Sequence, residues 1–304
     1  MPNILVSGLV NLETTCQVER FPVEYHPVRF SFFGIRSRAS GVGYNLAGAL
    51  TTLGDTVTLL SLVGSDPAGR AAFDALAAAG IATDYVLATV RETAQSVILY
   101  DPTGRRAIYT DIKDLQEQVY PPDRFAAALA GCDLAVLGTI NYSRPFLARA
   151  QATGVPIATD VHAVADLDDP YNADFMRAAT ILFMSHELLP DPPAVWARRV
   201  QERYDPAILV IGLGAEGALL AVRGADAPIH VPAAHTRPVV STVGAGDALF
   251  AAFLHSYRRG GDPYESLRRA VVFASWKIGV AGAGEGYLTG RALDTLYAAQ
   301  LTGR

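Results

Sequence analysis

The sequence Ser241-Thr242-Val243-Gly244-Ala245-Gly246-Asp247 leads directly into the apolar run Ala248-Leu249-Phe250-Ala251-Ala252-Phe253-Leu254. This pattern predicts a turn of small residues followed at once by a buried helix. The first N–H groups of a helix have no partner within it, and its dipole makes that end positive. A phosphate could therefore bind at this turn, since glycines let it approach the backbone closely. The same string could also be a tight turn that Asp247 merely caps.

Composition narrows the class of protein. The chain has 304 residues, of which 50% are hydrophobic, so it can bury a large core. Its net charge of −5 comes without any block of like charge, which argues against nucleic acid and membranes as partners. Cys16 and Cys132 lack metal-ligand spacing and are expected to be reduced thiols. We see no leader peptide and no apolar run of about 20 residues, so we expect a soluble, cytoplasmic protein.

Short aliphatic runs alternate with helical stretches along most of the chain. The expected strands are Ile4–Gly8, Thr56–Val63, Leu134–Gly138, Pro156–Asp160, Thr180–Met184 and Ala207–Ile211. The expected helices are Asn45–Leu53, Pro67–Ala79, Arg124–Ala130, Pro145–Thr153, Pro193–Tyr204, Gly246–Arg259, Pro263–Gly279 and Arg291–Ala299. This rhythm predicts an α/β fold, in which helices cover both faces of a mostly parallel sheet, over a single domain of residues 1–304.

Two regions interrupt the rhythm, at about residues 12–39 and 88–112. The first is polar and aromatic without a helical period, and the second indicates a hairpin of Gln95–Tyr100 and Arg106–Thr110 around the turn Asp101–Gly104. We expect them to form a small β-sheet that projects from the main domain, although they could be surface loops. Such a sheet could act as a lid over a cleft and exclude water from it. It could also mediate a homodimer.

The string from Ser241 to Asp247 resembles the C-terminal signature of the PfkB, or ribokinase-like, carbohydrate kinases, which usually reads Asp-Thr-x-Gly-Ala-Gly-Asp. The resemblance implies a three-layer α/β domain with a β-sheet lid. It also implies ATP-dependent transfer of phosphate to a hydroxyl, which in most members is a primary hydroxyl of a sugar or nucleoside. Asp247 would be the catalytic base, and the amides of Gly244, Ala245 and Gly246 would form an anion hole.

Two further motifs resemble the acceptor site of that family. Ser40-Gly41-Val42-Gly43-Tyr44-Asn45 is similar to the signature Gly-Gly-x-x-x-Asn, with Ser40 in place of the first glycine. Gly8-Leu9-Val10-Asn11-Leu12-Glu13 is similar to Gly-x-x-Asn-x-Asp, with Glu13 in place of the aspartate. Small residues would let a sugar lie against the backbone, while amide and carboxylate groups would bind its hydroxyls. The implied substrate-binding residues are Asn11, Glu13, Gly41, Gly43 and Asn45.

The nucleotide side rests on weaker motifs. Ile211–Gly217 is similar to the family's phosphate loop, Thr-x-Gly-x-x-Gly, with Gly212 in place of the threonine. The resemblance implies that ATP contacts Gly212, Gly214, Gly217 and Thr242, and that it also lies near Gly279–Gly284. Glu187 would organise Mg²⁺ through water, although Met184 stands where the family's paired asparagine would be. Alternatively, Glu187 is an ordinary acid at a helix start.

Ser241 is a departure from the family signature, whose first position is commonly an aspartate that helps to hold a monovalent cation. A serine hydroxyl carries no charge, so we expect activity that depends little on potassium. A protein that binds sugar without catalysis is a further alternative, because Glu13, Met184, Gly212 and Ser241 all depart from the pattern. The intact Gly-Ala-Gly-Asp argues against it.

Three acceptor classes remain open, with a sugar ranked first. A nucleoside ranks second, because Gly-Val-Gly-x-Asn resembles the corresponding motif of pseudouridine kinases. Aromatic residues of the first interrupting region could also stack on a base, although they could instead pack the lid. These are Tyr25, Phe30, Phe32 and Phe33. A sugar phosphate ranks third, since Ser241 and several nearby arginines would suit it. These are Arg29, Arg36, Arg38 and Arg106.

Overall fold

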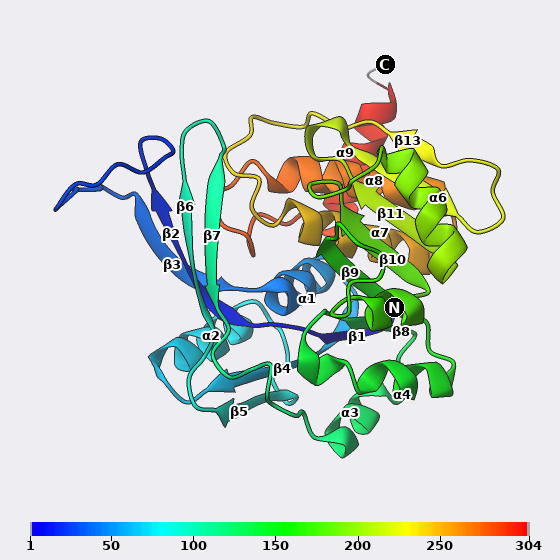
Figure 1. Cartoon of the computed structure of the whole chain (residues 1–304), viewed down its shortest axis with the longest axis horizontal. Helices are drawn as coiled ribbons and strands as arrows, with labels where there is room; N and C mark the ends of the chain where they lie inside the picture. Colours follow the sequence, from blue (N-terminus) through cyan, green and yellow to red (C-terminus); the bar gives the residue numbers. More distant parts are fainter. Residues whose placement is uncertain (1, 303–304) are drawn as a thin grey trace.

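The computed structural model describes residues 2–302, and these contain one large sheet with strands in the order β13-β12-β11-β10-β9-β8-β1-β4-β5 (Figure 1). The strands are β1 (Asn3–Ser7), β4 (Thr56–Gly64), β5 (Val86–Val90), β8 (Leu134–Leu137), β9 (Ile157–Ala163), β10 (Ile181–Ser185), β11 (Ile208–Gly212), β12 (Ala218–Val222) and β13 (Ile229–Val231). Pairing is parallel from β5 to β11 and antiparallel for β12 and β13. The expectation of a mostly parallel sheet is confirmed.

Helices cover both faces of this sheet, which makes three layers. One face carries α1 (Val42–Leu53), α2 (Pro67–Ala78), α7 (Ala245–Gly260), α8 (Pro263–Lys277) and α9 (Gly290–Thr302). The other face carries α3 (Pro122–Leu129), α4 (Phe146–Thr153), α5 (Ala173–Ala178) and α6 (Pro193–Tyr204). Each face has its own cluster of buried aliphatic and aromatic side chains, so the central strands are apolar on both sides.

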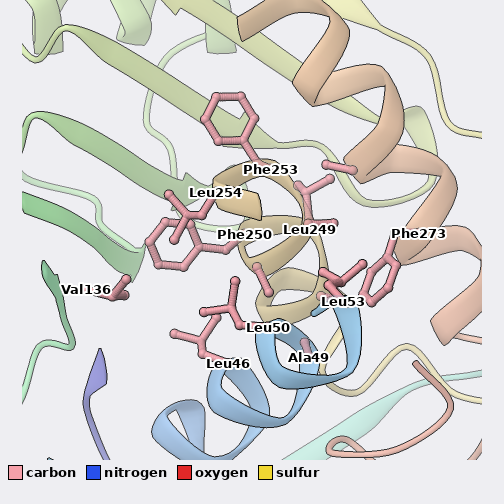
Figure 2. Close-up of a cluster of buried hydrophobic side chains, with 14 of the residues drawn as sticks. Leu46, Ala49, Leu50, Leu53, Val136, Leu249, Phe250, Phe253, Leu254 and Phe273 are labelled. Atoms are coloured by element: carbon pink, nitrogen blue, oxygen red, sulfur yellow. The ribbon is translucent and has the colours of Figure 1, made fainter. Parts of the chain in front are cut away.

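Helix α7 lies deepest in the first layer, where the run from Ala248 to His255 is buried all the way round. Figure 2 draws Leu46 and Leu50 of α1 in one cluster with Phe250 of α7. The ring of Phe250 also lies 4.5 Å, centroid to centroid, from that of Phe183 on β10. Because packing on all sides holds the helix, its first turn has a fixed place relative to the sheet.

A second sheet of four strands stands apart from the main one, on the left of Figure 1. Its order is β3 (Ile35–Ser40), β2 (Asn11–Gln17), β6 (Gln95–Tyr100) and β7 (Arg106–Asp111). The small sheet and the hairpin around Asp101–Gly104 are therefore confirmed, and the Gly104 N–H donates to the Asp101 carbonyl at 3.0 Å. The predicted start of the second interrupting region, at about residue 88, is wrong, however. Residues 88–90 belong to β5, which pairs with β4 at the edge of the main sheet.

Other elements were missed for identifiable reasons. Strands β12 and β13 follow the 211–217 loop and pair antiparallel at the far edge of the sheet, which the β-α-β rhythm does not predict. Helix α5 has six residues, too few to show a 3.6-residue period. No helix within residues 2–302 combines the length and apolar character that crossing a membrane would require.

The end of α7 remote from Asp247 is tied to the main sheet by a buried acid. The Asp55 side chain is fully buried just before β4. Its carboxylate lies 2.7 Å from His255 Nδ1 and accepts a hydrogen bond of 3.1 Å from Arg259 Nη2. Removing the acid would leave two basic groups without their buried partner.

We therefore expect Asp55→Ala to lower the free energy of unfolding by about 3 kcal/mol or more, the usual scale for breaking a buried charged pair. Chemical denaturation followed by far-UV circular dichroism measures this. Asp294→Ala is the matched control, because Asp294 pairs with Arg269 at the surface and its loss should change the free energy by less than about 1 kcal/mol. Equal effects of the two substitutions would contradict the assignment.

Candidate active site

The loop before α7 is shaped by Gly244, which precedes the helix with φ of +76°. A Cβ at this position would lie 2.6 Å from the carbonyl oxygen of Ala283, so only glycine fits. The N–H of Ala245 donates to the Thr242 carbonyl at 3.2 Å. The N–H groups of Gly244 and Gly246 have no acceptor among residues 2–302. Two of the three amides predicted for the anion hole are thus available, and Ala245 would first have to release Thr242.

Asp247 follows in the first turn of α7, and its carboxylate Oδ2 accepts a 2.7 Å hydrogen bond from Asn45 Nδ2. Burial raises the pKa of Asp247 above its ordinary value, although the Asn45 hydrogen bond acts in the opposite direction. The carboxylate of Asp160 at β9 raises this pKa further, whereas His162 and Lys277 lower it. A carboxylate with a raised pKa is a stronger base than an exposed one, which suits proton abstraction.

Asn45 joins the two glycine-rich motifs in space. It lies in the first turn of α1 and is only 3% exposed. Its Nδ2 binds Asp247, while its Oδ1 is buried without a hydrogen-bond partner among the described residues. A buried acceptor of this kind is normally paired, so a hydroxyl of a bound acceptor molecule would satisfy it.

Glu13 and Asn11 lie on the same face of β2, two residues apart. Glu13 is 8% exposed, and its carboxylate accepts a 3.0 Å hydrogen bond from Ser40 Oγ. Burial raises the pKa of Glu13, with Ser40 opposing the change. Asn11 Nδ2 donates to Ser96 Oγ at 3.1 Å, and its Oδ1 is buried without a partner in the described chain. Ser40, which replaces a family glycine, therefore orients the acid of the site.

The structure gives Gly41 and Gly43 a different reason for their small size. A Cβ at Gly43 would lie 2.6 Å from the backbone of Gly8, and one at Gly41 would lie 2.5 Å from the Leu9 carbonyl oxygen. The start of α1 thus packs directly on the loop after β1. Contact of a sugar with these glycines stays a prediction.

A cavity of about 510 Å³ opens beside Glu13, between the small sheet and helix α2. Arg38 and Glu285, which form an ion pair, line it together with small side chains of α2 such as Ala75. The cavity reaches Glu13 but is not lined by Asp247. Gly282 and Gly284 lie against Arg38 and Tyr44, so the glycine-rich stretch at 279–284 is close to the acceptor residues rather than only to the nucleotide loop.

An arginine of the small sheet reaches across to the loop before α7. Arg106 Nη1 donates to Thr242 Oγ1 at 2.8 Å, and its Nη2 lies 3.5 Å from Glu187 Oε1. These contacts join the small sheet to two residues predicted for the nucleotide side. From sequence alone, Arg106 is a candidate only for binding a phosphate on the acceptor, because residues 136 apart show no pattern that would connect them.

The loop from Gly212 to Gly217 follows β11 and is held by two histidines. His186 Nδ1 lies 2.9 Å from the Gly212 carbonyl oxygen, and His230 Nε2 lies 2.7 Å from that of Glu216. Gly217 has φ of +100°, and a Cβ there would meet the backbone of β13. The loop is thus preformed, and contact of ATP with Gly212, Gly214, Gly217 and Thr242 stays a prediction.

A role of Glu187 in organising a metal ion also stays a prediction. Its side chain is exposed and faces Arg106. Within residues 2–302, no group of three or more His, Cys, Asp or Glu side chains is placed to hold a metal ion. A magnesium ion that arrives with ATP would be bound largely by phosphates and water.

Comparison with known proteins agrees with this geometry. The family model for pfkB carbohydrate kinases matches residues 1–157 and 174–289. The acarbose 7(IV)-phosphotransferase of an Actinoplanes species is 28% identical over 273 residues, which cover 88% of each chain. The fructosamine kinase FrlD of Bacillus subtilis is 25% identical over 270 residues, which cover 87% of this chain and 91% of that protein.

Solved structures show the same fold. A microbiome-derived acarbose kinase, Mak1, superposes with a TM-score of 0.88 at 26% identity and covers 98% of this chain and 99% of its own. The ribokinase of Arabidopsis thaliana, complexed with ribose and ATP, has a TM-score of 0.79 at 22% identity and covers 97% and 98%. The chain therefore belongs to the pfkB family of carbohydrate kinases. It is an ATP-dependent kinase that acts on an alcohol group of a sugar or nucleoside.

We expect Glu13→Gln to raise the KM for the acceptor about tenfold and to leave the KM for ATP nearly unchanged, because the substitution removes a charged acceptor of hydrogen bonds. Steady-state kinetics with each substrate varied in turn measure both constants. Glu19→Gln, which changes an exposed acid in the connection between β2 and β3, should have no effect. An equal loss of affinity for ATP would show that Glu13 does not face the acceptor.

Proposed function

We propose that this kinase phosphorylates a hydroxyl of a sugar and that Asp247 is its general base. One observation carries the proposal: the Asp247 carboxylate, oriented by Asn45, lies in the same helical turn as the free N–H groups of Gly244 and Gly246. A proton acceptor and two donors to an anion thus lie side by side. Both are fixed in place by the buried body of α7.

The proposed reaction is an in-line transfer. Asp247 takes the proton from the acceptor hydroxyl, whose oxygen attacks the terminal phosphorus of ATP, while the bond from that phosphorus to the bridging β-phosphate oxygen breaks and ADP leaves. The N–H groups at the start of α7 stabilise the charge on the transferring group, and Mg²⁺, when bound with ATP, would supply neutralising charge to the phosphates. Arg106, which already reaches Thr242 from the small sheet, would hold that sheet closed over the reacting groups. Positioning and electrostatics supply most of the acceleration.

A neutral sugar suits the acceptor side best. Asn11 and Asn45 offer it uncharged amide groups with unpaired buried oxygens, Glu13 offers a carboxylate, and the charges of Arg38 and Glu285 in the cavity wall pair with each other. Two arginines that could have bound a phosphosugar are already paired, Arg29 with Glu19 and Arg38 with Glu285. A cavity of about 510 Å³ beside Glu13 leaves room for more than one ring, which matches the size usual for ligand pockets.

The aromatic residues that could have stacked on a nucleoside base lie elsewhere. Tyr25 and Phe33 are each 92% exposed, and Phe30 and Phe32 are nearly as exposed. All four belong to the connection between β2 and β3, at the tip of the small sheet that points away from the main sheet (Figure 1). They neither pack the small sheet nor line the cavity beside Glu13. This placement supports a sugar over a nucleoside.

We expect Asp247→Asn to reduce turnover by at least about a hundredfold while the affinity for ATP and the thermal stability stay close to wild type. Asp262→Asn is the matched control, since Asp262 caps the neighbouring helix α8 and asparagine caps equally well. Coupled ADP release measures the turnover and the apparent affinity for ATP of both variants. Near-normal turnover in folded Asp247→Asn would exclude this residue as the base.

The acceptor class is tested by the same ADP assay over a panel of pentoses, hexoses, oligosaccharides, nucleosides and their phosphates. We expect acceptor-dependent ADP release with at least one neutral saccharide. ADP release with nucleosides or phosphosugars alone would refute the sugar assignment. It would not affect the assignment of Asp247 as the base, which only an active Asp247→Asn variant would contradict. A chain that binds saccharides without any ADP release would be a non-catalytic binding protein.

A further inference from the structure

Lys277, the last residue of α8, is a charged side chain buried in the core beside the site, with an exposure of 0%. Its ammonium group donates a hydrogen bond to the carbonyl oxygen of Val243. No carboxylate forms an ion pair with it among the described residues, although Glu13, Asp247 and Glu285 are near enough to attract it. Burying an ammonium group without an ion-pair partner is unfavourable, so its presence needs a reason.

The peptide bond that Lys277 contacts is the one that supplies the first amide of the proposed anion hole. The Val243 carbonyl and the Gly244 N–H belong to the same peptide unit, which is trans. In a planar trans peptide these two groups point in opposite directions. An ammonium on the carbonyl side therefore lies behind the loop and leaves the N–H side open to an anion. It also polarises the peptide, which makes the N–H a stronger donor.

We propose that Lys277 is a positioning residue that supplies a built-in cation behind the anion-binding loop and occupies the place of a separate monovalent metal ion. This inference rests on the proposed function, since it assumes that the loop binds the transferring phosphoryl group. It explains why Ser241 suffices where an aspartate would serve a bound cation. The Ser241 hydroxyl accepts a 3.3 Å hydrogen bond from the Val243 N–H and so helps to hold the loop itself.

The surrounding charges keep the ammonium protonated near neutral pH. Burial lowers the pKa of Lys277 to about 8, and the carboxylates of Asp247 on α7, Glu13 on β2 and Glu285 before α9 oppose that decrease. Arg237 acts in the same direction as burial. The residues present do not fit an additional monovalent cation at this carbonyl, because a second positive charge would lie beside the ammonium.

The test compares wild type with Lys277→Ala, which removes the charge and leaves space for an ion. With tetramethylammonium as the only monovalent cation, kcat of Lys277→Ala should fall at least about a hundredfold, the scale of a lost anion-hole donor, with little change in the acceptor KM. Potassium or ammonium should restore kcat at least about tenfold with saturation. Wild type should respond to neither ion. Lys113→Ala, at the surface, is the matched control.

A second readout does not depend on activity. Potassium, compared with tetramethylammonium at equal ionic strength, should raise the unfolding temperature of Lys277→Ala but not that of wild type. If Lys277→Ala does not fold, Lys277→Met replaces it, since an apolar side chain of similar volume is tolerated where a buried charge was. That variant should be as inactive and should not be restored by potassium, because its side chain fills the space.

The inference is overturned by saturable activation of wild type by potassium, by near-normal kcat in either folded variant, or by a folded Lys277→Ala that no small cation restores or stabilises. Failure of the proposed function is a different result. In that case wild type would transfer phosphate to no acceptor, while the unfolding temperatures would still report whether an ion replaces the Lys277 ammonium.

Discussion

Burial of α7 is the constraint on which the rest of the site depends. Free N–H groups at a helix start can serve an anion only if that end of the helix does not move. Here the run from Ala248 to His255 is enclosed by α1, α8 and the main sheet, and Gly244 packs against the Ala283 carbonyl. The polar turn is therefore a rigid extension of the apolar core rather than a loop that must be ordered by its ligand.

The acceptor side is connected to this helix by one hydrogen bond. Asn45 links the first turn of α1 to Asp247, and close packing of Gly43 on Gly8 links the same turn to the loop after β1. That loop continues into β2, which carries Asn11 and Glu13. The base, the acceptor groups and the small sheet are thus linked by a continuous series of short contacts. Arg106 adds a contact from the opposite edge of the small sheet to Thr242.

Much of the fold and part of the site could be predicted from sequence. The parallel sheet and the small sheet follow from local periodicity and turn residues, and Gly54 ends α1 in the left-handed conformation as its position indicates. What could not be predicted depends on contacts between distant residues. Lys277 and Val243 are 34 positions apart, and nothing in α8 distinguishes a buried lysine from a surface one. The edge strands β12 and β13 were missed because their pairing is antiparallel.

We propose that the start of α7 binds the phosphoryl group during its transfer. Aluminium fluoride with MgADP imitates that group, and calorimetry in the presence of a saccharide acceptor would measure its binding. We expect fluoride and aluminium to tighten MgADP binding at least about a hundredfold, as a transition-state analogue does, and we expect Gly244→Ala to abolish this gain. Equal affinity for MgADP with and without aluminium fluoride in wild type would contradict it.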